Sequence, residues 1–163
     1  MATITLESIP AGPRRREFMD LLLLADDSAD QVARYIDLGE LFIAREADGA
    51  AAGLALVIRD GDGDGAEVKS VAVREDRQGR GIARAMLTDV IARQRAAGVR
   101  RLTVATGTSS LGPLALYQKL GFRLFRIDRD FFTPERGYPA EIWENGIRLR
   151  DMIWLDLDLD AAP

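Results

Sequence analysis

Residues 71–87 read VAVREDRQGRGIARAML and contain three structural signals in succession. The first residues end an apolar, β-branched segment, which is typical of a buried strand. The last residues place apolar side chains three and four positions apart, which is typical of an amphipathic helix. Gly79 and Gly81 lie between them, and because neither has a Cβ atom, the backbone there can come close to a ligand. The segment therefore predicts a strand, a glycine-containing turn and a long helix.

This turn is suited to bind an anion. The first turn of a helix leaves N–H groups without partners, and the helix dipole adds partial positive charge there, which suits a pyrophosphate. Arg80 and Arg84 can add charge at the rim. Three interpretations remain open: a turn without a ligand, a dinucleotide site and a coenzyme A pyrophosphate site. Arg84 stands where the dinucleotide motif has its third glycine, which disfavours that site, and no Gly-Lys-Ser/Thr follows to form a P-loop.

Hydrophobic spacing and turn residues predict the other elements. Strands are expected at 2–9, 41–46, 52–59, 67–73, 101–106, 122–127 and 152–160, and a loop at 133–145. Helices are expected at 14–25, between Ser28 and Gly39, at 81–97 and at 114–120. This order of strand, two helices, three strands, helix, strand, helix and two strands predicts a mixed α/β layer. Because the 163 residues contain no repeat or linker, we expect 1–163 to be a single domain.

Composition excludes several classes of site. The chain has no cysteine and no histidine, so a thiol nucleophile, an imidazole base and the usual zinc ligands are absent, and we expect no metal. Acid–base chemistry must use Asp, Glu, Tyr, Lys, water or the substrate. The net charge of −4 argues against a nucleic-acid partner. No signal peptide or membrane span is visible, so the sequence predicts a cytoplasmic protein with no membrane partner.

Two sequence blocks resemble the GNAT superfamily of acyl-CoA-dependent N-acyltransferases. QGRGIA at 78–83 matches the family signature Q/R-x-x-G-x-G/A, and LYQKLGF at 116–122 is similar to the block that closes the cofactor site. The C-terminal part is also similar to small bacterial members. The resemblance implies a GNAT fold, in which about four helices flank a mixed central sheet of about seven strands.

The same resemblance implies an activity. A GNAT enzyme moves an acetyl group from acetyl-CoA, its co-substrate, to a primary amine of a small molecule or peptide, by direct attack in a ternary complex. The alternative is a non-catalytic acyl-CoA-binding module or sensor. Two residues would be catalytic: Tyr117 would protonate the leaving thiolate, and Glu67 would be the general base. Lys69 should point to the same side as Glu67 and lower its basicity.

The resemblance also implies a set of acyl-CoA contacts. The backbones of Val71 and Val73 would pair with the pantetheine arm, and the N–H near Ala72 would bind the oxyanion. That pairing requires the fourth and fifth strands to separate. The pyrophosphate would lie on the turn formed by Gln78, Gly79, Arg80, Gly81, Ile82, Ala83 and Arg84. Ser110 stands where the family often has a cofactor-binding Asn, and its hydroxyl can cap the short helix.

Other side chains have two interpretations each. Four aromatic residues either line the acceptor pocket or pack the loop or a homodimer contact: Phe131, Phe132, Tyr138 and Trp143. Four apolar residues are expected in the core: Phe122, Phe125, Trp154 and Leu157. The run Arg14–Arg16 is expected to be a solvated helix start. The acidic, glycine-rich run at 60–65 is expected to be a turn between strands rather than a calcium loop, because Val71 occupies the position of the bidentate Glu.

Overall fold

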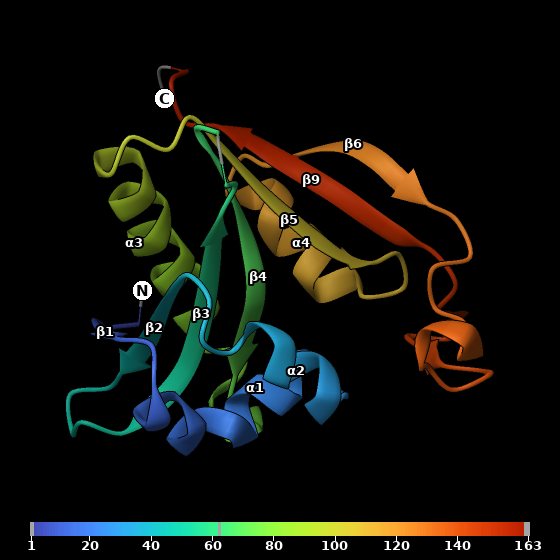
Figure 1. Ribbon diagram of the computed structural model, residues 1–163, viewed down its shortest axis with the longest axis horizontal. Helices are drawn as coiled ribbons and strands as arrows, with labels where there is room; N and C mark the ends of the chain where they lie inside the picture. The colour runs from blue at the N-terminus through green and yellow to red at the C-terminus, as the bar shows by residue number, and fades with distance from the viewer. Residues whose placement is uncertain (1, 62, 162–163) are drawn as a thin grey trace.

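The structure is a computed structural model and describes residues 2–61 and 63–161. Seven strands form the main sheet: β1 (Thr5–Ile9), β2 (Glu40–Arg45), β3 (Ala51–Arg59), β4 (Gly65–Val73), β5 (Arg101–Gly107), β6 (Arg123–Asp128) and β9 (Met152–Asp158). Their order is β1-β2-β3-β4-β5-β9-β6. Only β4 and β5 are parallel neighbours, because the helix between them carries the chain back across the sheet (Figure 1). The predicted order of elements is confirmed.

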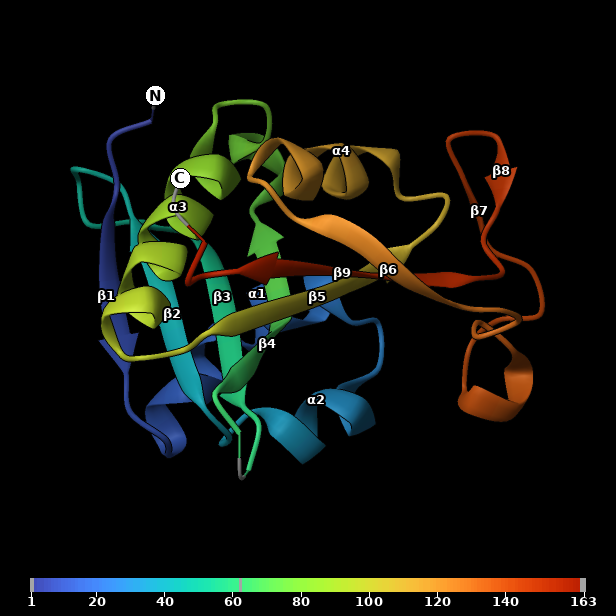
Figure 2. The ribbon, with the colours of Figure 1, turned by 90° about the horizontal axis from the view of Figure 1, so that it is seen from above.

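Helices cover both faces of the sheet. The helices α1 (Met19–Ala25) and α2 (Ala29–Tyr35) pack on one face, and α3 (Ile82–Ala96) and α4 (Leu111–Lys119) pack on the other (Figures 1 and 2). The predicted apolar stripe of α3 is buried, from Ile82 through Met86 and Val90 to Gln94. None of the helices in the described ranges is both long enough and apolar enough to cross a membrane.

The strands β4 and β5 separate at their carboxyl ends. Their pairing begins at Gly65 and Arg101 and stops at Val68 and Val104, although both strands continue for several residues. Figure 1 shows the two strands diverging from their paired ends. The separation that was expected for an extended ligand between the two strands is therefore present. Beyond Val68, the backbone groups of β4 on this side face the gap.

A β-bulge shifts the side chains of β4. Leu56 is opposite Ser70, whereas Val57 is opposite Val68, so Lys69 has no partner of its own in β3. Because side chains alternate along a strand, the extra residue reverses the alternation after Val68. Ala72 then packs with the residues of α1 and α2, on the same face as Ser70, whose hydroxyl contacts α2.

Residues 129–150 form an arm at the far end of the sheet. The sequence predicts a loop at 133–145, but the structure contains a short 3-10 helix, η3 (Pro134–Arg136), and a hairpin of β7 (Trp143–Glu144) and β8 (Ile147–Arg148). Figures 1 and 2 show the arm projecting beyond the helices. Leu149 anchors it against Gly107, where a Cβ atom would lie 2.4 Å from Leu149 Cδ1.

The prediction that Arg14–Arg16 is solvated was wrong for Arg15. Its side chain is 2% exposed and donates hydrogen bonds of 2.7–3.1 Å to the backbone carbonyls of Ile9, Ile36, Leu38 and Gly39. This guanidinium joins β1 to the segment after α2. The predicted helix 14–25 is divided into a 3-10 helix, η1 (Pro13–Phe18), and α1.

The predicted core is largely confirmed, with one exception. Phe122 is buried, and Trp154 and Leu157 are partly buried. Phe125 is 43% exposed: it belongs to β6, the last strand of the sheet, and a register shift leaves it without a partner in β9. The acidic run at 60–65 joins β3 to β4, as expected, although Asp62 lies outside the described residues.

Candidate active site

The turn before α3 has the left-handed glycines that its sequence predicts. Gly79 has φ 74° and Gly81 has φ 78°, and Gly81 is the N-cap of α3. Among the described residues, no side chain caps this helix and no acidic residue lies in its first turn. A Cβ atom on Gly79 would have no other described atom within 4 Å, and one on Gly81 would meet only the Ala2 nitrogen at 3.9 Å. The first-turn N–H groups are therefore open to an anion.

The other residues of this turn differ in exposure and in hydrogen bonding. Gln78 Nε2 donates to the Val73 carbonyl at 3.1 Å, so one of the backbone groups expected to bind pantetheine already has a partner in the chain. Arg80 and Arg84 are exposed, whereas Ile82, the first residue of α3, is buried in the core. The structure therefore brings the predicted pyrophosphate residues together in one turn.

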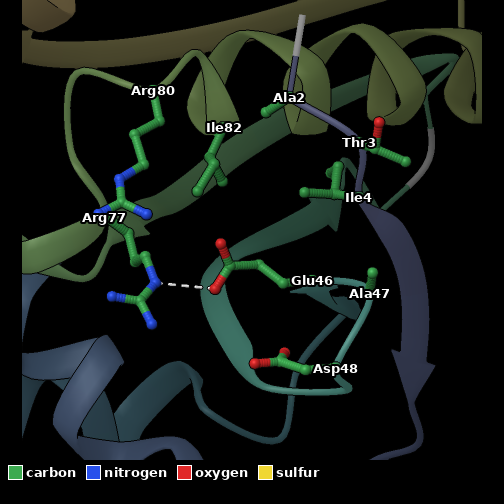
Figure 3. A pocket seen from close by; sticks show the side chains of 9 residues that line it. All are labelled: Ala2, Thr3, Ile4, Glu46, Ala47, Asp48, Arg77, Arg80 and Ile82. Atoms are coloured by element: carbon green, nitrogen blue, oxygen red, sulfur yellow. Dashed lines mark hydrogen bonds and ion pairs between the residues drawn. The ribbon is translucent and has the colours of Figure 1, made fainter.

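A cavity of about 510 Å³ lies on the β1 side of this turn (Figure 3). Its lining consists of Ala2, Thr3, Ile4, Glu46, Ala47, Asp48, Arg77, Arg80 and Ile82. Arg77 Nε is 2.8 Å from Glu46 Oε2, so the two charges that face each other there are paired. The cavity adjoins the turn through Arg80, but it does not include the gap between β4 and β5.

Glu67 lies near the paired end of β4, on the face that carries α1 and α2. Its nearest cation is Lys69, with Nζ 3.9 Å from Glu67 Oε1, as the sequence predicts. Burial raises the pKa of Glu67; Lys69 opposes this shift and Asp60 adds to it, and the net direction is upward. Lys69 lowers the pKa as predicted, but desolvation outweighs the neighbouring ammonium group, so the basicity of Glu67 is raised overall.

A hydrogen-bonded group lies next to Glu67 on this face. Ser70 Oγ is 3.4 Å from the Tyr35 hydroxyl, which donates to Asp26 Oδ2 at 3.2 Å. Lys69 Nζ lies 5.5 Å from the centre of the Tyr35 ring. Burial raises the pKa of Tyr35 to about 12. Sequence reasoning missed these residues as a group, since Tyr35 and Ser70 are 35 positions apart and no local motif connects them.

Tyr117 lies on α4, in the core cluster of the α3–α4 face. The same cluster contains Val68 and Val104, the last paired residues of β4 and β5. Tyr117 is 6% exposed, its ring meets Phe122 edge-on at 6.0 Å, and burial raises its pKa to about 12. With this pKa the hydroxyl is protonated at neutral pH. It has no hydrogen-bond partner in the described part of the chain, so its proton is available to a ligand.

Ser110 is the N-cap residue of α4, as predicted, but its hydroxyl does not cap the helix. The hydroxyl instead donates to Glu144 Oε2 at 2.6 Å, and Asn145 Nδ2 donates to the Ser109 carbonyl at 2.9 Å. The hairpin of the arm thus holds the loop before α4. Sequence reasoning missed Glu144, because 34 positions separate it from Ser110 and the intervening residues show no shared motif.

The aromatic residues of the arm pack mainly on one another. The ring centres of Phe131, Phe132 and Tyr138 are 4.9–6.1 Å apart, whereas Trp143 is 61% exposed at the hairpin. Burial raises the pKa of Tyr138, and the charges of Asp26 and Asp27 raise it further. Asp26 and Asp27 thus lie close enough to Tyr138 for their charges to act on its hydroxyl, and Arg136 opposes their effect.

Comparisons with known proteins agree with this geometry. Residues 7–122 match the acetyltransferase (GNAT) family. The chain is 41% identical over 143 residues, 88% of this chain and 90% of the other, to a Bacillus subtilis (strain 168) protein named uncharacterized N-acetyltransferase YvbK. A Bacillus subtilis acetyltransferase in complex with CoA shares 37% identity, with a TM-score of 0.86 over 96% of this chain and 99% of that one. An Elizabethkingia anophelis GNAT family acetyltransferase with acetyl-CoA bound shares 39% identity, with a TM-score of 0.84 over 95% and 97%.

Proposed function

The chain belongs to the GNAT family of acetyltransferases, and we propose that it transfers the acetyl group of acetyl-CoA to a primary amine of a small molecule or peptide. The observation that carries this proposal is the position of the open turn before α3 relative to the gap between β4 and β5. Only the short 3-10 helix η2 (Glu75–Arg77) separates the turn from β4, so an extended ligand with a pyrophosphate at one end would place its other end in the gap.

The backbone of β4 supplies the groups that such a ligand needs. Beyond Val68 the strand has no partner in β5, so Val71 and the N–H of Val73 remain for a ligand in the gap, whereas the Val73 carbonyl accepts from Gln78. An acyl-pantetheine arm would pair there in the manner of an added strand. The N–H near Ala72 would bind the carbonyl oxygen when negative charge develops on it. Two of the solved relatives contain CoA or acetyl-CoA, which supports this ligand.

The two catalytic candidates approach the gap from different faces of the sheet. Glu67 lies on the α1–α2 face, and Tyr117 lies in the core cluster of the α3–α4 face. We place the amine on the side of Glu67, between the arm and the turn before α2. We place the thioester sulfur on the side of Tyr117. Arranging two reactants in this way removes much of the entropic barrier to their reaction.

The proposed reaction has one bond formed and one broken. The amine nitrogen attacks the thioester carbonyl carbon, forming the C–N bond, and the C–S bond then breaks to release the thiolate. Glu67 accepts the proton that the amine loses. An ammonium group has a pKa of about 10, and the raised pKa of Glu67 brings the two pKa values closer, which favours proton transfer. Tyr117, which is protonated at neutral pH, donates its proton to the thiolate.

A thiol-release assay tests this function. The protein is incubated with acetyl-CoA and, in separate reactions, with an alkyl monoamine, a diamine, an amino acid, an aminoglycoside and a peptide with a free N-terminus. We expect free coenzyme A to appear with at least one of these amines and not without it, together with the acetylated amine by mass spectrometry. Acetyl-CoA that binds by calorimetry but releases no thiol with any amine would instead identify a non-catalytic acyl-CoA sensor.

A further inference from the structure

Lys69 lies where the gap between β4 and β5 begins. It is the first residue of β4 beyond Val68, the last residue that pairs with β5. It is also the extra residue of the β-bulge, so it has no partner in β3 either. The order along the strand is Glu67, then Lys69, then Ala72, near which we place the oxyanion. Along β4, Lys69 therefore lies between the proposed base and the proposed position of the thioester carbonyl.

The ammonium group of Lys69 is held in place by two neighbours. Its Nζ lies 3.9 Å from Glu67 Oε1 and 5.5 Å from the centre of the Tyr35 ring, a distance at which a cation is attracted to an aromatic face. Tyr35 is itself fixed, because it is 6% exposed and its hydroxyl contacts Asp26 and Ser70. The cation therefore has a defined position beside Glu67.

This ammonium group has unused hydrogen-bonding capacity. It can donate several hydrogen bonds, and none of them has an acceptor within the described residues. The 3.9 Å separation from Glu67 is too long for a hydrogen bond, whereas Arg45 and Arg77 lie 2.6 and 2.8 Å from the carboxylates with which they pair. The side chain of Lys69 is 39% exposed, so a ligand can reach it. Lys69 can therefore donate to an anionic group of a ligand while it stays beside Glu67.

The charges around Glu67 favour an acceptor that carries both signs. An amine with a pKa of about 10 reaches the site as an ammonium ion, which Lys69 repels. Glu67 attracts the same ion, and Asp60 adds negative charge near it. A carboxylate next to the amine of the acceptor resolves this conflict, because the ammonium then pairs with Glu67 and the carboxylate with Lys69. Both contacts are charge-assisted, which makes them stronger than neutral hydrogen bonds.

The short separation between Glu67 and Lys69 restricts the acceptor further. Two groups 3.9 Å apart match an ammonium and a carboxylate that are close together in the acceptor as well. A free α-amino acid meets this condition, because its amine and its carboxylate are bonded to the same carbon atom. The α-amine of a peptide does not meet it, since the neighbouring carbonyl belongs to an uncharged amide.

The site is less well suited to an acceptor with a second cation. Asp26 and Asp27 lie in the turn before α2, near Tyr138 of the arm. Asp26 uses both of its oxygens within the chain, since Oδ2 accepts from the Tyr35 hydroxyl and Oδ1 accepts from the Ser28 N–H. Asp27 is exposed, so solvent and salt weaken its attraction for a cation. The structure therefore favours an anionic group beside the amine over a distant cationic one.

We propose that the acceptor is a free α-amino acid, whose ammonium group faces Glu67 and whose carboxylate binds Lys69. This inference rests on the proposed function and makes Lys69 a specificity-determining residue. The bonds formed and broken are those of the proposed reaction: the α-nitrogen gains the acetyl group and loses its proton to Glu67, and the thiolate leaves. The carboxylate is unchanged, and the product is an N-acetyl amino acid.

Matched pairs of acceptors test this inference. The thiol-release assay is run with several α-amino acids, each compared with its own α-carboxamide, which keeps the amine and the side chain and removes the negative charge. We expect kcat/KM to be higher for the amino acid than for the amide. Lys69→Met should lower the ratio of the two by at least about ten-fold, because a charge-assisted contact is lost. Lys69→Arg, which keeps the positive charge, should retain most of the ratio.

The ratio separates the proposed contact from the other effects of Lys69. Loss of its charge also changes the basicity of Glu67 and the packing on Tyr35, but these changes act on the amino acid and on the amide alike. Lys119→Met, on the exposed side of α4, is the matched control and should leave the ratio unchanged. Calorimetry gives a second readout. With the chain saturated with coenzyme A, the amino acid should bind more tightly than its amide, and Lys69→Met should abolish the difference.

Three results would overturn the inference: an equal preference for acid and amide, a ratio that Lys69→Met leaves unchanged, or faster turnover of an alkyl diamine than of every amino acid. In each of these cases free coenzyme A is still released, so the proposed function stands. Absence of thiol release with every acceptor would contradict the proposed function instead. Calorimetry with coenzyme A bound then decides whether Lys69 binds the carboxylate.

Discussion

Lys69 Nζ lies 3.9 Å from Glu67 Oε1, on the face of β4 that is turned toward α1 and α2. The ammonium group lowers the pKa of the carboxyl group, but burial raises it by more. The ion pair is partly exposed, and solvent weakens the attraction between such charges, whereas removal of the carboxylate from water acts on Glu67 alone. Glu67 therefore has a higher basicity than an exposed glutamate, although a lysine lies beside it.

Removing Lys69 should move the pH dependence of the reaction. Lys69→Met eliminates the interaction that lowers the Glu67 pKa, so the base becomes protonated at a higher pH. We expect the acidic limb of kcat/KM to shift to higher pH, which a pH–rate profile with saturating acetyl-CoA measures. Lys119→Met, on the exposed side of α4, is the matched control. An acidic limb that does not move in Lys69→Met would mean that Glu67 is not the group that titrates.

The raised pKa of Glu67 also predicts a stability effect. The folded chain binds the Glu67 proton more tightly than the unfolded chain, whose glutamate has the ordinary pKa of 4.5. Below pH 4.5 the group is protonated in both states and has no effect, and as the pH rises through the folded pKa the carboxylate destabilises the fold. The free energy of unfolding of Glu67→Gln, measured relative to the unmodified chain, should therefore be higher at pH 8 than at pH 4. Urea unfolding at both pH values measures this, and a constant difference would contradict it.

Tyr117→Phe should separate catalysis from binding. The substitution keeps the ring against Phe122 and removes only the hydroxyl, which has no partner among the described residues. We expect kcat to fall by a factor on the order of 100, the usual contribution of a general acid. The affinity for acetyl-CoA, measured by calorimetry, should change little. Turnover equal to that of the unmodified chain would remove Tyr117 from the mechanism.

Arg15→Met should destabilise the fold without touching the active site. The guanidinium donates to four buried or partly buried carbonyls, and its loss leaves them without a donor, at a cost of about 3 kcal/mol in the free energy of unfolding. Arg14→Met is the control, because its exposed pair with Glu7 is worth at most about 1 kcal/mol. Denaturant unfolding of both variants measures the difference, and similar losses in the two would show that Arg15 is not a structural link.

Local patterns predicted the elements and the turn, because apolar spacing and glycine position are properties of neighbouring residues. The order of strands and helices and the open turn at Gly79 and Gly81 follow from such patterns. These patterns did not reveal which side chains are buried by residues that lie far away in the sequence. Arg15 looks like one of three solvated arginines until Ile36 and Gly39 are brought beside it.

The same limit applies at the C-terminal end. Phe125 has the composition of a core residue, but its exposure depends on β6 being the last strand of the sheet. The hydroxyl of Ser110 has the sequence context of a helix cap, and only the folding of the arm brings Glu144 to it. Element type was therefore predictable, whereas the partners of polar side chains were not.

Gly81 provides the sharpest test of the anion site. With φ 78° the residue is left-handed, so any substitution has a conformational cost, and the comparison must be between two side chains of equal shape. Asn and Asp tolerate this conformation about equally and differ in charge. We expect Gly81→Asp to bind coenzyme A at least about ten-fold more weakly than Gly81→Asn, roughly 1.4 kcal/mol, because its carboxylate lies where the N–H groups of α3 would meet the pyrophosphate. Calorimetry at low and high salt measures both affinities, and the difference should shrink as salt screens the charges. Equal affinities at low salt would show that the pyrophosphate does not lie at this turn.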